Sequence, residues 1–182
     1  KAFIDVLTGL FNHRYFRENI RLEVARAHRY GRDLTLAFFD ADHFKQINDT
    51  HGHPTGDLVL QRISEVLRKA TRAADIPVRM EAKPFAARYG GEEFVVILPE
   101  TNLECGVTLS ERIRETVAAM DFHDTSGEAI GKVTLSAGVA SLNLDDKDDH
   151  PETLVRRADD ALYSAKEGGR NRVVAAAAPA RS

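Results

Sequence analysis

Apolar residues recur along the chain with two different periods, and these periods predict helices and strands in separate segments. Apolar positions at helical spacing predict helices at about 12–30, 54–70, 103–119 and 151–167, with a short helical piece at 43–49. The nearly continuous apolar run over 34–39 predicts a strand that is buried on both faces. Further strands are predicted as a hairpin over 85–98, with its turn at Gly90-Gly91, and at 132–140 and 172–175.

The order of these elements predicts the fold. After the first helix, the order is β-α-β-β-α-β, and a helix and a strand complete the chain. This order is typical of an α+β fold with a ferredoxin-like or palm-type βαββαβ core. We expect an added N-terminal helix, a C-terminal helix-strand and a central, mostly antiparallel sheet. One domain is expected over residues 1–175, with a frayed tail at 176–182.

The composition indicates a globular domain with a small ligand and disfavours a nucleic-acid-binding protein. Of the 182 residues, 43% are hydrophobic, and the formal net charge is −3, with Lys and Arg scattered rather than clustered. No apolar run approaches the ~18 residues of a membrane span. The single cysteine, Cys105, excludes an internal disulfide, so we expect a reducing, cytoplasmic compartment. Its helical spacing to Leu109 and Ile113 predicts that Cys105 is buried in the core.

Three carboxylates lie where two predicted elements end. Asp40 follows the buried strand directly, and Glu92 and Glu93 follow the Gly-Gly turn of the hairpin. If the hairpin pairs beside the first strand, Asp40 and Glu92 meet at one edge of the sheet. Hard oxygen ligands of this kind suit Mg²⁺, which also keeps some of its water. The alternative is a solvated acidic loop in which Asp40 or Asp42 caps the next helix.

Four segments of the chain carry distinctive motifs. They are residues 5–12 (DVLTGLFN), residues 39–57, which include FDADHFKQIND, residues 88–94 (RYGGEEF) and residues 159–172, which include GRNR. Together they resemble the GGDEF domains of diguanylate cyclases, and residues 88–94 resemble the family signature in its GGEEF form. Four motifs in the family's order, spanning about residues 5–174, are far more specific than one glycine pair.

The resemblance implies a metal site and a catalytic role for individual positions. Asp40 and Glu92, with the backbone carbonyl of Ala41, would hold Mg²⁺, or Mn²⁺ in its place. Glu93 would assist at the metal or help to deprotonate the attacking hydroxyl. Both roles for Glu93 stay open at this point.

The resemblance also implies residues that bind the nucleotide. Asn48 and Asp57 would read guanine, whose N1–H and N2–H donors lie side by side; adenine has no such pair, which disfavours an ATP-using cyclase. Lys166 and Arg170 would bind the triphosphate, although cations at the end of a helix are also favoured by the helix dipole alone. Further phosphate contacts would come from the backbone amides of Phe44 and Lys45, at a helix start.

The activity that the resemblance implies needs two copies of the chain. Each copy of a homodimer would hold one GTP, and two GTP would condense into cyclic di-GMP and two pyrophosphates. The alternative is a catalytically silent module that binds GTP or cyclic di-GMP in signalling. Because the chain begins at Lys1 rather than Met, we expect a fragment. An upstream sensor domain, and any membrane anchor, would lie outside it.

A product-inhibition site of this family uses an RxxD motif shortly before the glycine turn. Here Arg72 and Asp75 supply the motif, and residues 76–84 are interpreted as an insertion that separates it from the hairpin. Arg112 on the next helix is a further candidate for binding cyclic di-GMP, because a guanidinium fork suits guanine edges and phosphates. The alternative for Arg72 and Asp75 is a salt bridge at the end of a helix, worth under ~1 kcal/mol.

Overall fold

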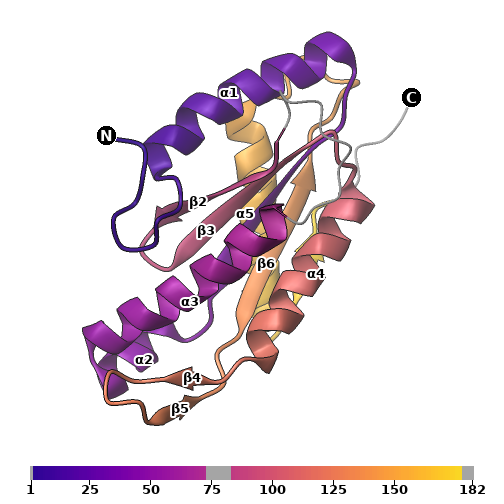
Figure 1. The fold of residues 1–182 in the computed structure, drawn as a ribbon. Helices are drawn as coiled ribbons and strands as arrows, with labels where there is room; N and C mark the ends of the chain where they lie inside the picture. Colours follow the sequence, from indigo (N-terminus) through magenta and orange to yellow (C-terminus); the bar gives the residue numbers. More distant parts are fainter. Residues whose placement is uncertain (1, 73–82, 178–182) are drawn as a thin grey trace.

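A five-stranded sheet forms the centre of the fold in the computed structural model, which describes residues 2–72 and 83–177 (Figure 1). Its strands lie in the order β2-β3-β1-β6-β7. Their bounds are Leu34–Ala41 (β1), Phe85–Gly90 (β2), Glu93–Pro99 (β3), Leu135–Ser141 (β6) and Val173–Ala175 (β7). Neighbouring strands are antiparallel except β6 and β7, which are parallel. The predicted α+β fold with a mostly antiparallel ferredoxin-like sheet is therefore confirmed.

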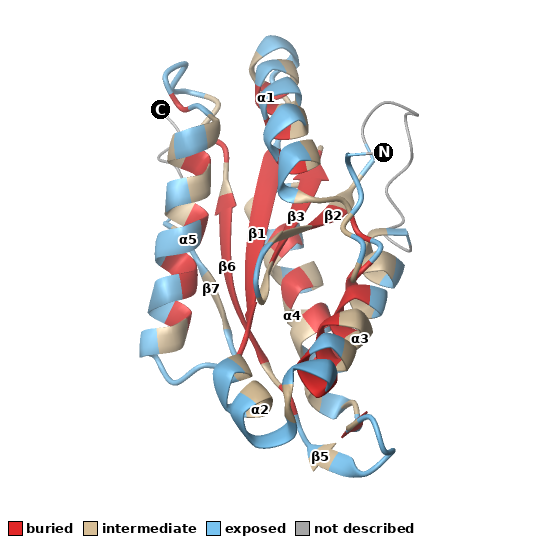
Figure 2. Cartoon of the chain, turned by 90° about the vertical axis from the view of Figure 1, so that its left-hand side faces the viewer, coloured by how far each residue is buried: buried red, intermediate tan, exposed pale blue. Residues whose placement is uncertain are grey.

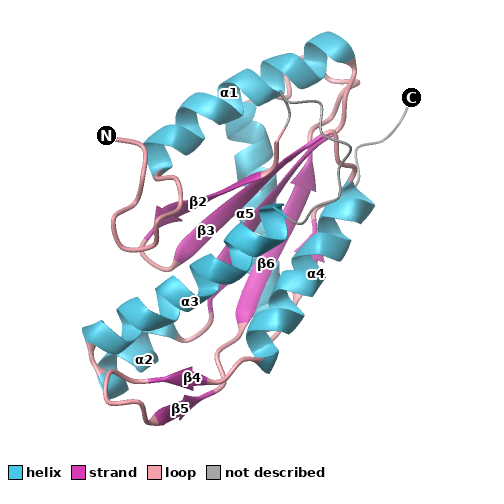
Figure 3. Ribbon diagram, viewed as in Figure 1, coloured by secondary structure: helices cyan, strands magenta, loops and turns pink. Residues whose placement is uncertain are grey.

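Helices cover both faces of this sheet (Figure 3). Helices α1 and α5 lie on one face, and α3 and α4 lie side by side on the other, while α2 follows the end of β1. Their bounds are His13–Tyr30 (α1), Phe44–His51 (α2), His53–Arg72 (α3), Leu103–Ala119 (α4) and Pro151–Glu167 (α5). A small ribbon of β4 (Phe122–His123) and β5 (Ala129–Gly131) lies beside α2 and the start of α3.

Alternation along the strands creates two separate hydrophobic cores, as expected for a sheet covered on both faces. In β1, Leu36 and Phe38 pack with α1 and α5, whereas Ala37 and Phe39 pack with α3 and α4. Figure 2 shows β1 and β6 buried between these layers. By the same alternation Asp40 belongs to the α1 and α5 side, at the end of the strand.

Helix ends follow from residues that can cap them. Asn12 and Asn102 precede α1 and α4 in extended conformation, and each side chain accepts a hydrogen bond from a backbone N–H three residues on. At α5, His150 and Thr153 form a reciprocal capping box, with Pro151 in the first turn. These local signals explain why the bounds predicted for α4 and α5 agree with the structure.

Several predicted details differ from the structure. The helical piece predicted at 43–49 extends to His51, and α3 already begins at His53, so only Gly52 separates them. The strand predicted at 132–140 begins at Leu135, and the β4-β5 ribbon was not predicted. The hairpin turn is formed by Gly91 and Glu92, because Gly90 pairs with Glu93; only Gly91 needs a positive φ, of 50°.

Cys105 was also predicted wrongly, because it is exposed. The buried positions of α4 are Gly106, Ser110, Ile113 and Val117. Ile113 is buried as predicted, but in the first half of the helix the buried positions, Gly106 and Ser110, lie one residue after Cys105 and Leu109. The reason is Gly106, which lets the helix approach β1: an added Cβ there would lie 2.5 Å from Cγ2 of Thr35.

Helix α5 approaches β6 closely at Gly138, and this contact should govern stability. A Cβ at Gly138 would lie 2.2 Å from both the carbonyl oxygen of Ala158 and the backbone nitrogen of Leu162. Backbone atoms cannot move away singly, so α5 would have to shift. We expect Gly138→Ala to lower the free energy of unfolding by about 2 kcal/mol, measured by urea denaturation. Gly90→Ala is the matched control, because nothing lies within 4 Å of that Cβ; equal stability of both variants would contradict the prediction.

Candidate active site

The end of β1 and the turn of the hairpin meet, and this brings the predicted carboxylates together. Asp40 is paired with Glu93 across β1 and β3, and the backbone nitrogen of Ala41 donates to the carbonyl oxygen of Glu92 at 3.2 Å. Residues opposite each other in a sheet point to the same face, so Asp40 and Glu93 both lie on the α5 side. Asp40 is only 5% exposed, whereas Glu92 and Glu93 are half-buried.

Lys166 reaches this carboxylate cluster from the last turn of α5. Its Nζ lies 2.7 Å from Oδ2 of Asp40, so residues 126 positions apart form a hydrogen-bonded ion pair. The Lys166 ammonium group therefore points into the site. It does not lie against the last carbonyls of α5, which is where the helix dipole alone would favour it. Charged side chains in such buried ion pairs cluster at functional sites, although structural ion pairs have the same features.

Burial and mutual repulsion perturb two of the carboxyl groups. Burial raises the pKa of Asp40, and the nearby carboxylates of Glu92 and Asp42 act in the same direction, while the hydrogen bond and charge of Lys166 oppose them. Burial also raises the pKa of Glu93, with Asp40 as the next contributor. The cluster thus holds more negative charge than one lysine neutralises, and an added cation would be attracted to it.

Arg88 joins the hairpin turn to the loop that opens the chain. Its Nε donates to the carbonyl oxygen of Gly91 at 3.0 Å, and its Nη1 lies 3.3 Å from Oδ1 and Oδ2 of Asp5. Asp5 in turn accepts hydrogen bonds from the backbone and hydroxyl of Thr8. This pair holds the turn that carries Glu92. Neither residue was predicted to have a role, although both lie in the segments that carried the resemblance.

Asp42 is a buried hydrogen-bond acceptor. It is 5% exposed, and it accepts from the hydroxyls of Ser136 at 2.6 Å and Thr134 at 2.7 Å and from the backbone nitrogen of Asn171 at 3.0 Å. The alternative in which Asp40 or Asp42 caps the next helix is therefore wrong. The N-cap of α2 is His43, which has a φ of 54° and makes no side-chain capping bond.

Asn48 lies against Gly56 where α2 meets α3. A Cβ at position 56 would lie 1.9 Å from Oδ1 of Asn48 and 3.0 Å from Cζ of Phe44, so only glycine leaves room for this side chain. Within the part of the chain that the structure describes, Oδ1 of Asn48 is buried without a hydrogen-bond partner. A buried acceptor of this kind favours a ligand that donates hydrogen bonds. Asp57 lies one residue beyond Gly56 and is exposed.

The family profile described as "Diguanylate cyclase, GGDEF domain" matches residues 2–172. The chain belongs to the GGDEF family.

Relatives and solved structures agree with this assignment. The GGDEF domain is 48% identical to diguanylate cyclase DgcP of Pseudomonas aeruginosa over 173 residues, which are 95% of this chain and 24% of that protein. It is similar to the GGDEF domain of DgcB from Caulobacter crescentus, solved in complex with c-di-GMP, at 37% identity and a TM-score of 0.87, covering 97% of this chain and 96% of that one. It is also similar to the active GGEEF domain of a diguanylate cyclase from Vibrio cholerae, at 35% identity and a TM-score of 0.78, covering 95% and 99%.

The donor set of the GGDEF domain fits a hard divalent cation. Asp40, Glu92 and the carbonyl of Ala41 offer oxygens only, which Mg²⁺ and Mn²⁺ prefer. Across residues 2–72 and 83–177, no group of three or more His, Cys, Asp or Glu side chains could hold a metal ion. The expected set of Asp40 and Glu92 has two such side chains and depends on substrate phosphates and water for the remaining ligands, so it is compatible with that result; a third ligand from Glu93 is not supported by it.

The other predicted positions of the GGDEF domain lie around the cluster or on different surfaces. Arg170 follows the end of α5 and is exposed, as is Lys45 in the first turn of α2. Arg72 ends α3 and is exposed. Arg112 lies on α4 in a hollow of about 440 Å³ between α3 and α4. Asp75 lies outside the described residues, as does most of the predicted insertion, so the structure does not show whether these residues meet.

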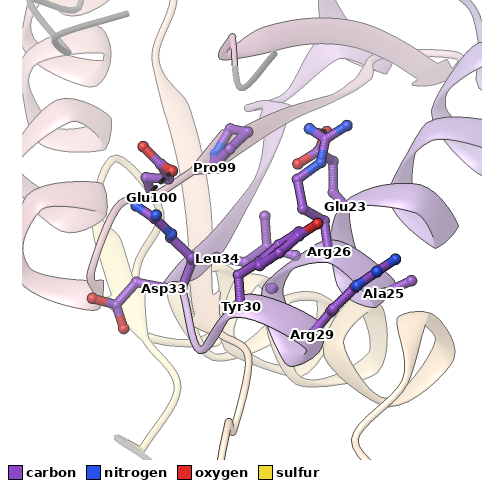
Figure 4. A pocket seen from close by; sticks show the side chains of 11 residues that line it. Glu23, Ala25, Arg26, Arg29, Tyr30, Asp33, Leu34, Pro99 and Glu100 are labelled. Atoms are coloured by element: carbon purple, nitrogen blue, oxygen red, sulfur yellow. Dashed lines mark hydrogen bonds and ion pairs between the residues drawn. The ribbon is translucent and has the colours of Figure 1, made fainter. Parts of the chain in front are cut away.

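A second hollow of the GGDEF domain lies away from the carboxylates. It measures about 520 Å³ and is formed by the end of α1 and the adjacent ends of β1 and β3 (Figure 4). Arg32 and Glu100 form an ion pair at 3.1 Å across it, and Tyr30 is exposed at its rim. None of the predicted catalytic or metal-binding residues line this hollow, so the carboxylate cluster remains the candidate active site.

Within residues 2–72 and 83–177, no helix combines the length and the apolar character that a membrane crossing requires.

Proposed function

We propose that this domain is a diguanylate cyclase that condenses two GTP molecules into cyclic di-GMP and two pyrophosphates. The observation that carries the proposal is the meeting of Asp40, the Glu92 turn, Glu93 and Lys166 at one end of the sheet. The names of the relatives, and the GGEEF sequence shared with an active domain, support it. The chain spans about a quarter of DgcP, so the activity of the complete protein is part of the proposal.

In this proposal Asp40, Glu92 and the carbonyl of Ala41 hold Mg²⁺ or Mn²⁺. The bound cation supplies Lewis-acid polarisation of the phosphoryl oxygens and offsets the charge of the triphosphate. Lys166, which already lies in the cluster, contacts phosphate oxygens, and Arg170 joins it from the turn beyond α5. The side chains of Lys166 and Arg170 thus keep the nucleotide close to the acidic side chains. Two local cations suffice for this, so no extended basic surface is needed.

Glu93 is the candidate general base for the attacking 3′-hydroxyl. The 3′-oxygen of one GTP attacks the α-phosphorus of the other, its proton leaves, and pyrophosphate departs; the same step repeated in the opposite direction closes the ring. A raised pKa makes a carboxylate a better proton acceptor near neutral pH, and burial raises that of Glu93. Assistance at the metal is the alternative role, and the two roles differ in whether Glu93→Gln weakens cation binding.

Asn48 and Asp57 are the proposed guanine readers. The buried, unpartnered Oδ1 of Asn48 accepts from guanine, while the exposed Asp57 carboxylate can accept N1–H and N2–H together. Adenine would leave these acceptors without donors, which costs about 1–3 kcal/mol for each buried group. Selection of GTP over ATP follows from this loss.

The partners of the domain are also proposals. Two copies meet face to face, because each holds one of the two reacting GTP molecules. Cyclic di-GMP is the product and, through Arg72, Asp75 and Arg112, a candidate inhibitor; an end-of-helix role for Arg72 and Asp75 is the alternative. DgcB was solved with c-di-GMP bound, which supports product binding in this family.

Incubation of the domain with GTP and Mg²⁺, followed by mass analysis, tests the proposed activity. Cyclic di-GMP and pyrophosphate are expected, with a rate per chain that rises with protein concentration as dimers form. ATP in place of GTP should give no cyclic product. Binding of GTP or cyclic di-GMP without turnover at high protein concentration would replace the proposal with the catalytically silent module.

The pH dependence of cation binding should show the perturbed carboxylate. Because burial raises the pKa of Asp40, this group takes up a proton at a higher pH than an exposed aspartate, whose pKa is about 3.9. A proton on Asp40 removes a ligand charge, so we expect Mn²⁺ affinity to fall as the pH drops toward that raised pKa. Lys166 opposes the shift, so Lys166→Met should move the fall to still higher pH. Equal Mn²⁺ affinities of the unaltered domain and Lys166→Met at every pH would contradict this assignment.

A further inference from the structure

The turn between α5 and β7 has an unusual backbone conformation. It covers residues 168–172 and carries Arg170, whose φ is 65°, followed by Asn171, whose φ is 45°. Non-glycine residues rarely adopt positive φ, and two in succession need support from surrounding groups. The turn is also bonded to the end of α5, because the backbone nitrogen of Gly169 donates to the carbonyl oxygen of Lys166 at 3.2 Å and that of Arg170 to Ala165 at 3.0 Å.

Two side chains from distant parts of the sequence hold Asn171 in this conformation. Its backbone nitrogen donates to Oδ2 of Asp42 at 3.0 Å, and Asp42 is itself fixed by two hydroxyl donors. Its side-chain Oδ1 accepts from Nη1 of Arg114 at 2.9 Å. Arg114 lies on α4, on the opposite face of the sheet from α5, so the turn is held from both sides.

Arg114 is well placed to act as an anchor. Its side chain is 17% exposed, and its Nε and Nη2 both donate to Oε2 of Glu111, at 3.0 and 2.8 Å. Glu111 thus occupies one edge of the guanidinium and leaves Nη1 for Asn171. A planar group fixed along one edge presents its remaining donor in a defined direction, which lysine could not do.

We propose that Arg114 is a positioning residue for triphosphate binding, acting through Asn171 on the turn that carries Arg170 and adjoins Lys166. The inference rests on the proposed function, in which those two cations bind the phosphates. Without this anchor the turn relaxes from its left-handed conformation, and Arg170 must be ordered each time a nucleotide binds. Preorganisation of a binding group lowers the entropic cost of binding.

Arg114→Ala tests the anchor through two ligands that differ in their phosphates. The probes are a GTP analogue with a methylene bridge between the α- and β-phosphates, which is not turned over, and GMP, both measured calorimetrically with Mg²⁺. We expect the affinity for the analogue to fall about tenfold, while GMP affinity stays unchanged, because only the analogue reaches the turn. With GTP itself, KM should rise about tenfold and kcat should change little.

Matched variants separate positioning from a general structural effect. Glu115→Ala is the control on the same helix: its side chain is 70% exposed and lies 3.7 Å from Arg114, so it should bind both ligands normally. Asn171→Gly keeps the left-handed backbone and its bond to Asp42 but removes the acceptor for Arg114. It should weaken analogue binding to the same degree as Arg114→Ala, and the double variant should be no worse.

Two results would overturn the inference. Unchanged analogue affinity in Arg114→Ala would show that the turn does not need the anchor, and equal losses for the analogue and GMP would indicate a structural effect. Failure of the proposed function gives a different result, because the unaltered domain would then form no cyclic di-GMP from GTP, whatever its affinity for the analogue.

Discussion

Glu92→Gln should lose at least about a thousandfold in the rate of cyclic di-GMP formation while remaining folded. The expected metal contribution of several kcal/mol to transition-state stabilisation corresponds to about three orders of magnitude. The amide has the shape of the carboxylate but no charge, so it is a poor ligand for a hard cation. Glu92 is half-buried in a turn whose position depends on Arg88 and on backbone pairing, and not on its own side chain. The measurements are turnover with GTP and Mg²⁺, and urea unfolding.

The control for this variant is an exposed glutamate outside the site. Glu128→Gln removes the same charge from an exposed side chain in the connection between β4 and β5. Because this residue lies outside the site, the variant should leave turnover unchanged. Mn²⁺ titration should show weakened binding in Glu92→Gln and normal binding in Glu128→Gln. Full activity of Glu92→Gln would remove Glu92 from the catalytic residues, and normal Mn²⁺ binding would remove it from the metal site.

Elements with strong local signals could be predicted from the sequence. Helix α5 begins at a proline with a capping box and ends where glycines follow, and its predicted bounds agree with the structure. The hairpin and the first strand were found because their apolar runs are bounded by turn residues. Their antiparallel pairing then brought Asp40 and the Glu92 turn together, as expected from the position of both at the ends of strands.

The predictions that failed concern contacts between elements. Cys105 was placed in the core because its helical spacing to apolar residues is regular, but α4 approaches the sheet at Gly106, and Cys105 beside it is exposed. The ion pair between Asp40 and Lys166 joins α5 to β1, and no local pattern could predict it. Asp42 was considered as a helix cap, whereas its partners come from β6 and the turn before β7.

Long-range contacts support two turns of the site. In each, the residue proposed to bind metal or phosphate is held by residues that are not themselves proposed ligands. Arg88 supports the Glu92 turn, and Asp42 with Arg114 supports the turn of Arg170. The proposed binding residues can be identified from the sequence by their chemical type. The supporting residues can be identified only once their partners in the structure are known. Such supporting contacts are what hold binding groups at fixed positions.

Gly56→Ala should lower kcat/KM for GTP by at least about a hundredfold, because the methyl group and Asn48 cannot occupy the same space. The added Cβ would lie 1.9 Å from Oδ1 of Asn48, which is the free end of a side chain, whereas the backbone of the buried Gly56 is fixed in the first turn of α3. Asn48 must therefore leave the position from which we propose that it accepts a hydrogen bond from guanine. Folding stability should change little, and selectivity for GTP over ATP should fall together with activity.

A double-mutant cycle decides whether Gly56 acts through Asn48. Asn48→Ala alone should match the loss of Gly56→Ala, and the double variant should be no worse than either, because the clash disappears with the side chain that causes it. The ring of Phe44, 3.0 Å from the same Cβ, can move aside at its free end. Additive losses would mean that Gly56 affects the site by another route, and unchanged GTP selectivity in all three variants would remove Asn48 from guanine recognition.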